Sequence, residues 1–228
     1  LMLGSPSSDD RSEWFESFQN LLMDQESQTQ FKMPAQYMFK DVPDLSNQDD
    51  TIAYALEQMD KHNIHRAMLG IDDVSPTHHQ ALKQHPTRFF SAYEANANKG
   101  MEEVRKIRRL YKEHNLKAVT AFPSGLCPQV PINDKKWYPI YATCIDLDIP
   151  FCPCAGIPGP RIPAEPQKVE HIDEVCWFFP ELKLVMKHGA EPWVDLAVKL
   201  MIKYPNLYYM TSAFAPKYYQ HAAGAGSD

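Results

Sequence analysis

The chain has 228 residues, 44% of them hydrophobic, and a formal net charge of −6. This length allows one large domain or two small ones, and no break in composition favours two. The negative charge argues against nucleic acid as the main partner, and no apolar run approaches the roughly 18 residues of a membrane span.

The cysteines and the N-terminus indicate where the protein works. The five cysteines lack zinc-finger spacing, and the first residues lack the charged and apolar regions of a signal peptide. We therefore expect reduced thiols in a cytoplasmic protein.

The N-terminal part is irregular. Residues 1–3 form a short apolar run that is typical of a strand end, and an apolar stripe from Trp14 to Leu22 predicts a helix. The aromatic segment 31–44 is long for a connection, which suits either a lid or a loop that covers the core. We treat residues 5–50 as a long excursion after the first strand of a single domain spanning 1–228.

Helical stripes and short apolar runs then alternate along the chain. Predicted helices cover residues 52–59, 101–114, 137–146 and 172–179. Predicted strands start near residues 67, 89, 117, 150, 183 and 206, which are 22 to 33 residues apart. This is the spacing of βα units in a parallel sheet.

The nearest standard architecture is an eightfold barrel of about 250 residues. The alternative is an open doubly wound sheet, but no glycine-rich phosphate loop follows the first strand. We predict an α/β fold, a TIM-type (β/α)8 barrel that lacks its last βα unit. Two strand edges would then be unpaired, so we expect a homo-oligomer.

A single histidine stands where one strand passes into the next helix. Residues 182–186 form a buried-strand pattern, followed by His188 and Gly189. Active sites of parallel α/β folds gather at that edge, so His188 is a candidate general acid/base. The alternative is a ring that only satisfies hydrogen bonds at the barrel rim. Glu191 and Pro192 predict the start of the next helix, since proline suits its first position.

Three segments carry a family resemblance. Residues 85–89 read His-Pro-Thr-Arg-Phe, residues 136–150 contain Trp-Tyr-Pro-Ile-Tyr, and residues 179–193 run from Phe-Pro-Glu-Leu to His188-Gly and Pro-Trp. They are similar to motifs of the amidohydrolase-related (amidohydrolase 2) family of (β/α)8 barrels. The resemblance implies a hydrolase or decarboxylase that acts on a small carboxylate or acyl substrate at the barrel mouth, with His188 as acid/base.

The resemblance also implies a divalent metal, typically zinc, held by histidines on strands one and five and an aspartate on strand eight. These ligand positions fall on Leu1, Leu3 and Cys154, and the aspartate has no clear counterpart. We therefore predict a divergent branch with no metal ligands and leave the cofactor open. Cys152 and Cys154 share one face of a strand, either as a buried thiol pair or as zinc thiolates.

Three further residues are candidates for substrate binding. Arg161 lies in a proline-rich loop, where its guanidinium suits a carboxylate or belongs simply to the surface. Trp193 is a candidate wall of an apolar pocket, and Glu191 borders His188 or serves the helix N-terminus. The alternative to an enzyme is a non-catalytic barrel that binds a small-molecule ligand or a partner chain, its metal site lost.

Overall fold

The computed structural model describes residues 19–29, 50–71 and 76–212. The predicted strand at residues 1–3, including Leu1 and Leu3, lies outside them, as do most of the predicted helix around Trp14 and the loop 31–44. No helix in the described part of the chain is both long and apolar enough to cross a membrane.

The described chain alternates between strands and helices. The strands are β1 (Ala67–Gly70), β2 (Phe89–Glu94), β3 (Ala118–Ala121), β4 (Phe151–Pro153), β5 (Leu184–Met186) and β6 (Leu207–Tyr209). The α-helices are α2 (Gln25–Thr29), α3 (Thr51–Lys61), α4 (Pro76–Gln84), α5 (Met101–His114), α6 (Tyr138–Asp146), α7 (Glu170–Phe178) and α8 (Val194–Lys203). Short 3-10 turns η2 (Ala97–Lys99), η3 (Pro123–Gly125), η4 (Lys135–Trp137), η5 (Glu165–Gln167) and η6 (His188–Ala190) lie between them.

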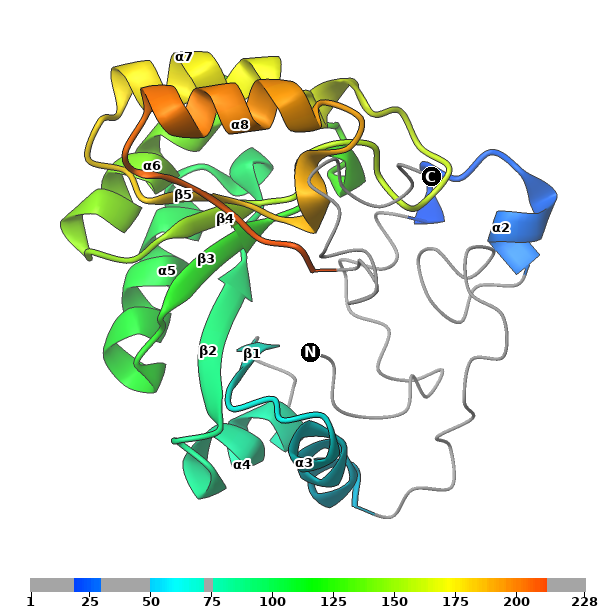
Figure 1. Cartoon of the computed structure of the whole chain (residues 1–228), viewed down its shortest axis with the longest axis vertical. Coiled ribbons are helices and arrows are strands. Elements are labelled where there is room, and N and C mark those ends of the chain that lie inside the picture. Colours follow the sequence, from blue (N-terminus) through cyan, green and yellow to red (C-terminus); the bar gives the residue numbers. More distant parts are fainter. Residues whose placement is uncertain (1–18, 30–49, 72–75, 213–228) are drawn as a thin grey trace.

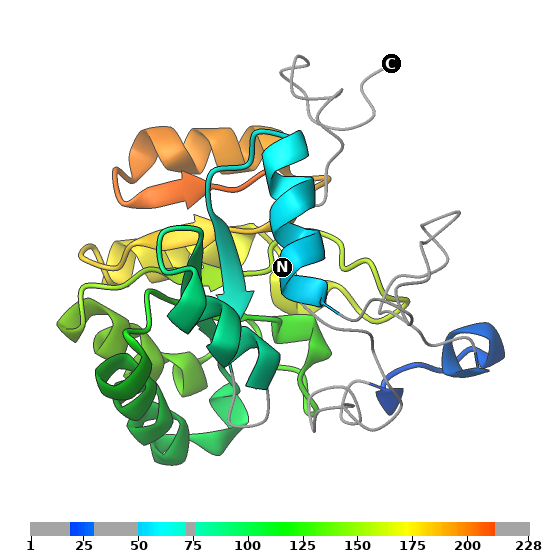
Figure 2. The ribbon, with the colours of Figure 1, turned by 90° about the horizontal axis from the view of Figure 1, so that it is seen from below.

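All six strands form one parallel sheet in the order β1-β2-β3-β4-β5-β6. Each strand therefore pairs with its neighbour in the chain, for example through Ala92 with Ala118 and Leu184 with Leu207. The helices α5 to α8 cover one face of the sheet, as two perpendicular views show (Figure 1, Figure 2). The predicted alternation and parallel sheet are confirmed.

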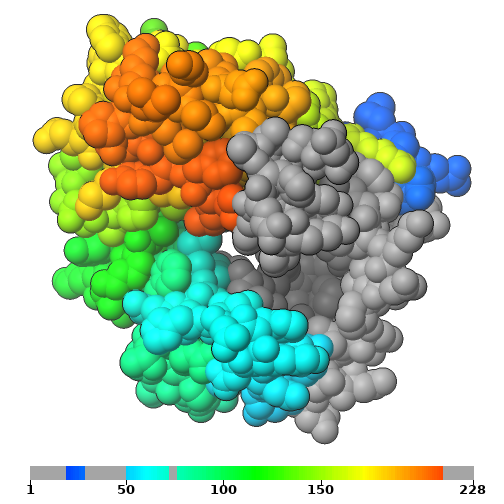
Figure 3. All heavy atoms as spheres, in the orientation of Figure 1, coloured from blue at the N-terminus to red at the C-terminus, as the bar shows by residue number. Residues whose placement is uncertain are grey.

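The largest hydrophobic core lies between the sheet and these helices. Trp137 and Tyr141 are fully buried, and their rings contact Phe151 of β4 with centroid distances of 5.4 and 4.8 Å. A smaller core joins α3 and α4 to β1 through Leu69 and to β2 through Phe89. In the space-filling view, α8 and β6 lie on one side of the visible face and α3 on the other (Figure 3).

Local sequence explains where individual helices begin and end. Asp50 caps α3 by accepting hydrogen bonds from the backbone of Ile52 at 3.1 Å and Ala53 at 2.9 Å. Asn115 ends α5 in the left-handed conformation, with φ 53°. Glu103 in the first turn of α5 accepts from the backbone of Asn96 at 2.7 Å and from the hydroxyl of Tyr93 at 2.8 Å.

One predicted boundary is wrong. The bond between Glu191 and Pro192 is cis and lies in a loop, and α8 begins only at Val194. The end of β5 leads first into the tight turn η6, and three further residues separate this turn from the start of α8. All five cysteines are free thiols, as predicted.

Candidate active site at the mouth of the barrel

The inner face of the sheet, opposite helices α5 to α8, is built in layers. Small side chains from neighbouring strands pack together there: Ala92, Ala118 and Cys152, with Met68 and Val185 beside them. Residues two positions further along each strand share this face and lie nearer the C-terminal ends. They are Glu94 on β2, Thr120 on β3, Cys154 after β4 and Lys187 after β5.

Lys187 is the positively charged group of this outer layer, and Glu94 is its acidic one. Its residue is only 7% exposed, a backbone bridge joins it to Cys154, and its ammonium interacts with the Cys154 thiol. Burial by itself lowers the pKa of Lys187, but the combined effect of Cys154, Glu94 and Cys152 outweighs it and raises the pKa. The pKa of Lys187 is thus raised overall, and while both thiols are protonated Glu94 is the neighbour whose negative charge favours the ammonium.

The two cysteines beside it are protonated at neutral pH. Burial raises the pKa of Cys152 to about 11 and also raises that of Cys154, although the Lys187 ammonium opposes both shifts. Both side chains are buried. These properties agree with the expectation of a buried thiol pair and leave no thiolate ready for a metal.

His188 follows directly at the strand end. Its Nδ1 lies 3.2 Å from the Ser212 hydroxyl and 3.4 Å from the Ser212 carbonyl oxygen. Surrounding protein and the Lys187 charge lower the pKa of His188 to about 4, even though the side chain keeps contact with solvent. The imidazole is therefore neutral at pH 7, and the contacts at Nδ1 leave Nε2 as the nitrogen for other chemistry.

The backbone around His188 is held in an unusual turn. His188, Gly189 and Ala190 have φ values of 66°, 75° and 56°, a left-handed run that costs free energy at the two residues with a Cβ. The turn is fixed by hydrogen bonds from the Gly189 amide to Met210, at 3.2 Å, and from the Tyr209 hydroxyl to Gly189. Such over-determined strain is concentrated at functional sites.

A close backbone approach supports the same turn from the other side. Gly156 has a φ of +92°, and a Cβ built on it would lie 2.5 Å from the carbonyl oxygen of Glu191 and 2.8 Å from the carbonyl carbon of Ala190. The amide of Ile157 donates to that same Glu191 oxygen at 2.7 Å. The loop after β4 is therefore packed directly on the loop after β5.

Glu191 and Trp193 border the turn. Glu191 is half-buried, and loss of solvent raises the pKa of its carboxyl. The pKa of Tyr209 is raised first by burial and then by the charge of Glu191, so these two side chains lie near each other. Trp193 is half-buried against the main core and precedes α8. Substrate contacts for Glu191 and Trp193 stay predictions.

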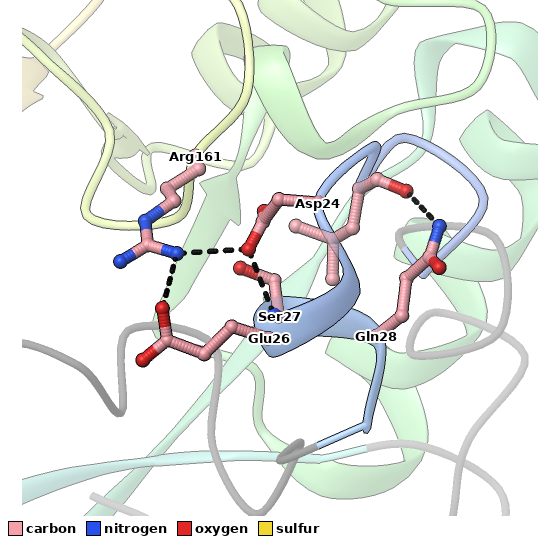
Figure 4. Close-up of polar contacts among 6 residues, drawn as sticks. Asp24, Glu26, Ser27, Gln28 and Arg161 are labelled. Atoms are coloured by element: carbon pink, nitrogen blue, oxygen red, sulfur yellow. Dashed lines mark hydrogen bonds and ion pairs between the residues drawn. The ribbon is translucent and has the colours of Figure 1, made fainter.

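Arg161 is held by two carboxylates of the N-terminal segment. Its Nη1 lies 2.8 Å from Asp24 Oδ1 and 2.8 Å from Glu26 Oε2 (Figure 4). Leu22 of the same segment packs on Phe122 and Cys154. The structure thus places Arg161 in a clamp that fastens residues 19–29 beside Cys154, and its predicted role in substrate binding remains untested.

The candidate residues fall into two groups. His188, Glu191 and Trp193 meet around η6 at the strand end, whereas Arg161 belongs to the loop after β4 and faces α2. Sequence reasoning missed Lys187 and Glu94 as members of the site. Side chains two residues apart on a strand share a face, so the face of Cys152 and Cys154 can be followed onto the neighbouring strands. This pattern is the sequence signal that identifies Lys187 and Glu94.

A parallel α/β barrel with a polar layer at the C-terminal strand ends defines a protein whose working site is the barrel mouth. Residues 32–226 match the family described as amidohydrolase, so the chain belongs to the amidohydrolase family. A comparison with proteins of curated function found no match.

Solved structures confirm the barrel. A TIM-barrel protein from Bordetella bronchiseptica is 24% identical with a TM-score of 0.60, over 70% of this chain and 58% of that chain, so our sequence spans little more than half its length. A 2,6-dihydroxybenzoate decarboxylase from Rhizobium is 12% identical with a TM-score of 0.55, over 83% and 80%. A 4-oxalomesaconate hydratase from Rhodopseudomonas palustris is 16% identical with a TM-score of 0.53, over 90% and 71%. At such identities the likeness establishes the fold alone.

The metal that the family implies does not fit the described donors. No group of three His, Cys, Asp or Glu side chains that suits a metal occurs in residues 19–29, 50–71 and 76–212. Cys154 occupies the position that the resemblance gives to a ligand histidine. Its thiol is neutral and lies beside the Lys187 ammonium. A neighbouring positive charge disfavours a cation there, so no step of the chemistry below uses a metal.

Proposed function

We propose that the protein is an amidohydrolase-family hydrolase or decarboxylase that acts on a small carboxylate or acyl substrate at the barrel mouth, with His188 as acid/base. The observation that carries the proposal is the neutral, solvent-accessible imidazole of His188 in a strained turn at the end of β5. Active sites of α/β barrels occupy this end of the strands.

Hydrolysis suits a neutral imidazole most directly. His188 would take a proton from water as the water oxygen bonds to the acyl carbon, and would return that proton to the leaving group as the acyl bond breaks. The Lys187 ammonium, next in the chain, supplies positive charge for the oxyanion that forms in between.

Decarboxylation is the second reaction that the site supports. As the bond to the departing carbon dioxide breaks, the electron pair left on the substrate carbon takes up a proton. His188 can donate that proton only in its protonated form, so this reaction would be favoured near or below pH 4. Two of the structural relatives are named as a 2,6-dihydroxybenzoate decarboxylase and a 5-carboxyvanillate decarboxylase, so aromatic acids belong in the substrate panel.

The test compares His188→Gln with His62→Gln, since His62 is an exposed histidine at the end of α3. Both variants are assayed on panels of amides, esters, lactones and aromatic carboxylic acids, with circular dichroism as the check of folding. The proposal expects turnover in the wild type and in His62→Gln, and a loss of at least about 100-fold in His188→Gln. Equal turnover in all three proteins would remove His188 from the chemistry.

The non-catalytic alternative, a barrel that only binds a ligand or a partner chain, is favoured by the ammonium and thiol at a metal-ligand position. It expects no turnover on any panel, with thermal stabilisation by a bound compound still observed. The expected homo-oligomer is a separate proposal, and light scattering of the purified protein tests it.

A further inference from the structure

Lys187 is unusual because a lysine side chain is rarely buried without a paired acid at hydrogen-bond distance. Among the residues that the structure describes, the neighbours that act on its ammonium are the thiols of Cys154 and Cys152 and the carboxylate of Glu94, and of these the Cys154 thiol is the one near enough to serve as an acceptor. An ammonium has three N–H donors. Two of them are therefore left without an acceptor in the described part of the protein.

The thiol is a weak acceptor, so it satisfies the charge poorly. Glu94 acts on Lys187 through its charge and not through a hydrogen bond. The Glu94 carboxylate therefore does not engage the N–H donors of the ammonium. A buried cation with unused donors binds an anion more strongly than an exposed one, because less water competes.

The neighbours of Cys154 limit what kind of anion fits. Leu22 and Phe122 pack on Cys154, and Leu21 and Ile162 lie against this cluster. Below Lys187 on the inner face are the small side chains of Ala92, Ala118 and Cys152. Apart from Glu94 and Thr120 of the same layer these surroundings are apolar, so a ligand with an apolar body and one charged end matches them better than a highly charged one.

We propose that Lys187 is the anion anchor of the barrel mouth. Its ammonium binds the carboxylate of a small monocarboxylic acid with an apolar body, and so takes over the positive charge that a metal supplies elsewhere in the family. The inference rests on the proposed function in that both use the same mouth, but it concerns binding and needs no turnover. It assigns to Lys187 a positioning role separate from the proton transfer at His188.

The first experiment uses the unchanged protein and two probes of nearly equal shape. Benzoate carries the carboxylate, whereas benzamide is its neutral counterpart. We expect calorimetric binding and thermal stabilisation with benzoate, at least about 10-fold weaker binding of benzamide, and no stoichiometric zinc or manganese by elemental mass spectrometry. Equal binding of both probes, binding of neither, or one equivalent of bound metal would overturn the proposal.

The second experiment changes the anchor. Lys187→Met keeps the length of the side chain and removes its charge, and Lys199→Met on the exposed surface of α8 is the matched control. We expect benzoate affinity to fall at least 10-fold in Lys187→Met and to stay within twofold in Lys199→Met. Should Lys187→Met fail to fold, the comparison of benzoate with benzamide on the wild type still decides.

This design separates the two proposals. If benzoate binding depends on Lys187 but no turnover is found, the anion-anchor proposal is supported and the enzymatic function is rejected. If turnover is lost in His188→Gln and benzoate binding is unchanged in Lys187→Met, the enzymatic function is supported and the anion-anchor proposal is rejected.

Discussion

The guanidinium of Arg161 lies 2.8 Å from the carboxylate of Asp24, a residue 137 positions earlier in the chain. The same Nη1 also reaches Glu26, so one side chain of the loop after β4 fixes two acids of the N-terminal segment. Leu22 in that segment covers Cys154. The ion pair thus links a surface contact to the layer that contains Lys187.

Arg161→Met should release residues 19–29 from the barrel mouth. We expect amide hydrogen exchange in this segment to rise several-fold, because the two carboxylates lose their common partner. Arg108→Met is the control, since Arg108 makes a comparable exposed ion pair with Asp146 at 2.7 Å. Unchanged exchange in Arg161→Met would show that packing of Leu22 alone holds the segment.

Acid should open the same clamp. The pKa of Asp24 is lowered to about 2, chiefly by hydrogen bonds from Ser27 and further by Arg161. A lowered carboxyl pKa stabilises the docked segment above the ordinary value of 3.8, and this stabilisation is lost as the pH falls from there toward 2. Proteolysis by pepsin at pH 4 and at pH 2 should therefore cut residues 19–29 faster at the lower pH, and Asp24→Asn should reduce this difference.

Because the pKa of His188 is lowered, both the stability of the fold and the reaction rate should fall on acidification. The folded state resists protonation of the ring, so this group costs stability as the pH falls below the ordinary value of 6.5 toward about 4. If the neutral ring is the base, the rate should rise with pH through about 4 and stay level near neutrality. NMR titration of the ring protons, assigned by their loss in His188→Gln, measures the value, and a midpoint near 6.5 would contradict the described environment.

Gly156→Ala should disturb the turn around His188. Its new methyl group would overlap backbone atoms of Ala190 and Glu191, and alanine is strained at a φ of +92°. We expect a loss of about 1–3 kcal/mol in the free energy of unfolding, measured by urea denaturation, and a lower kcat if the turn positions His188. Gly70→Ala is the control because a Cβ there meets nothing within 4 Å.

Glu103→Ala should destabilise the start of α5. It removes, inside a fully buried site, the carboxylate oxygen that accepts from the Asn96 amide and the Tyr93 hydroxyl, at a cost of about 1–3 kcal/mol. Burial raises the pKa of Glu103, so its ionised form costs stability as the pH rises above 4.5. Glu103→Gln keeps one acceptor without the charge and should retain most of the stability at pH 7 by urea denaturation.

The βα repeat could be predicted from the sequence because the apolar pattern and the local helix caps indicate the same helices and strands. The stripe of residues 101–114 coincides with α5, and the predicted strand starts lie within three residues of the six observed ones. Helix α4 was not predicted as an element, because Ala81 is its only buried residue and its apolar stripe is correspondingly weak.

The site was only partly predictable. His188 stood out because it ends a strong strand pattern, but the left-handed turn that follows depends on Gly156 and Tyr209, which are distant in sequence. Lys187 was not among the predicted site residues, since a lysine is normally exposed. Side chains alternate between the two faces of a strand, and this alternation places Lys187 on the same face as Cys154. That the two residues are neighbours follows only from the pairing of β4 with β5, which the sequence does not state.

The clamp also gives the folding of this chain an order in time. Every pairing in the sheet joins strands that follow one another, so the sheet can grow one βα unit at a time during synthesis. Residues 19–29 leave the ribosome early, yet Arg161, their partner, is made 137 residues after Asp24. Arg161 therefore cannot fix residues 19–29 until β4 and its loop are complete, which makes this contact one of the later ones in the assembly of the described sheet.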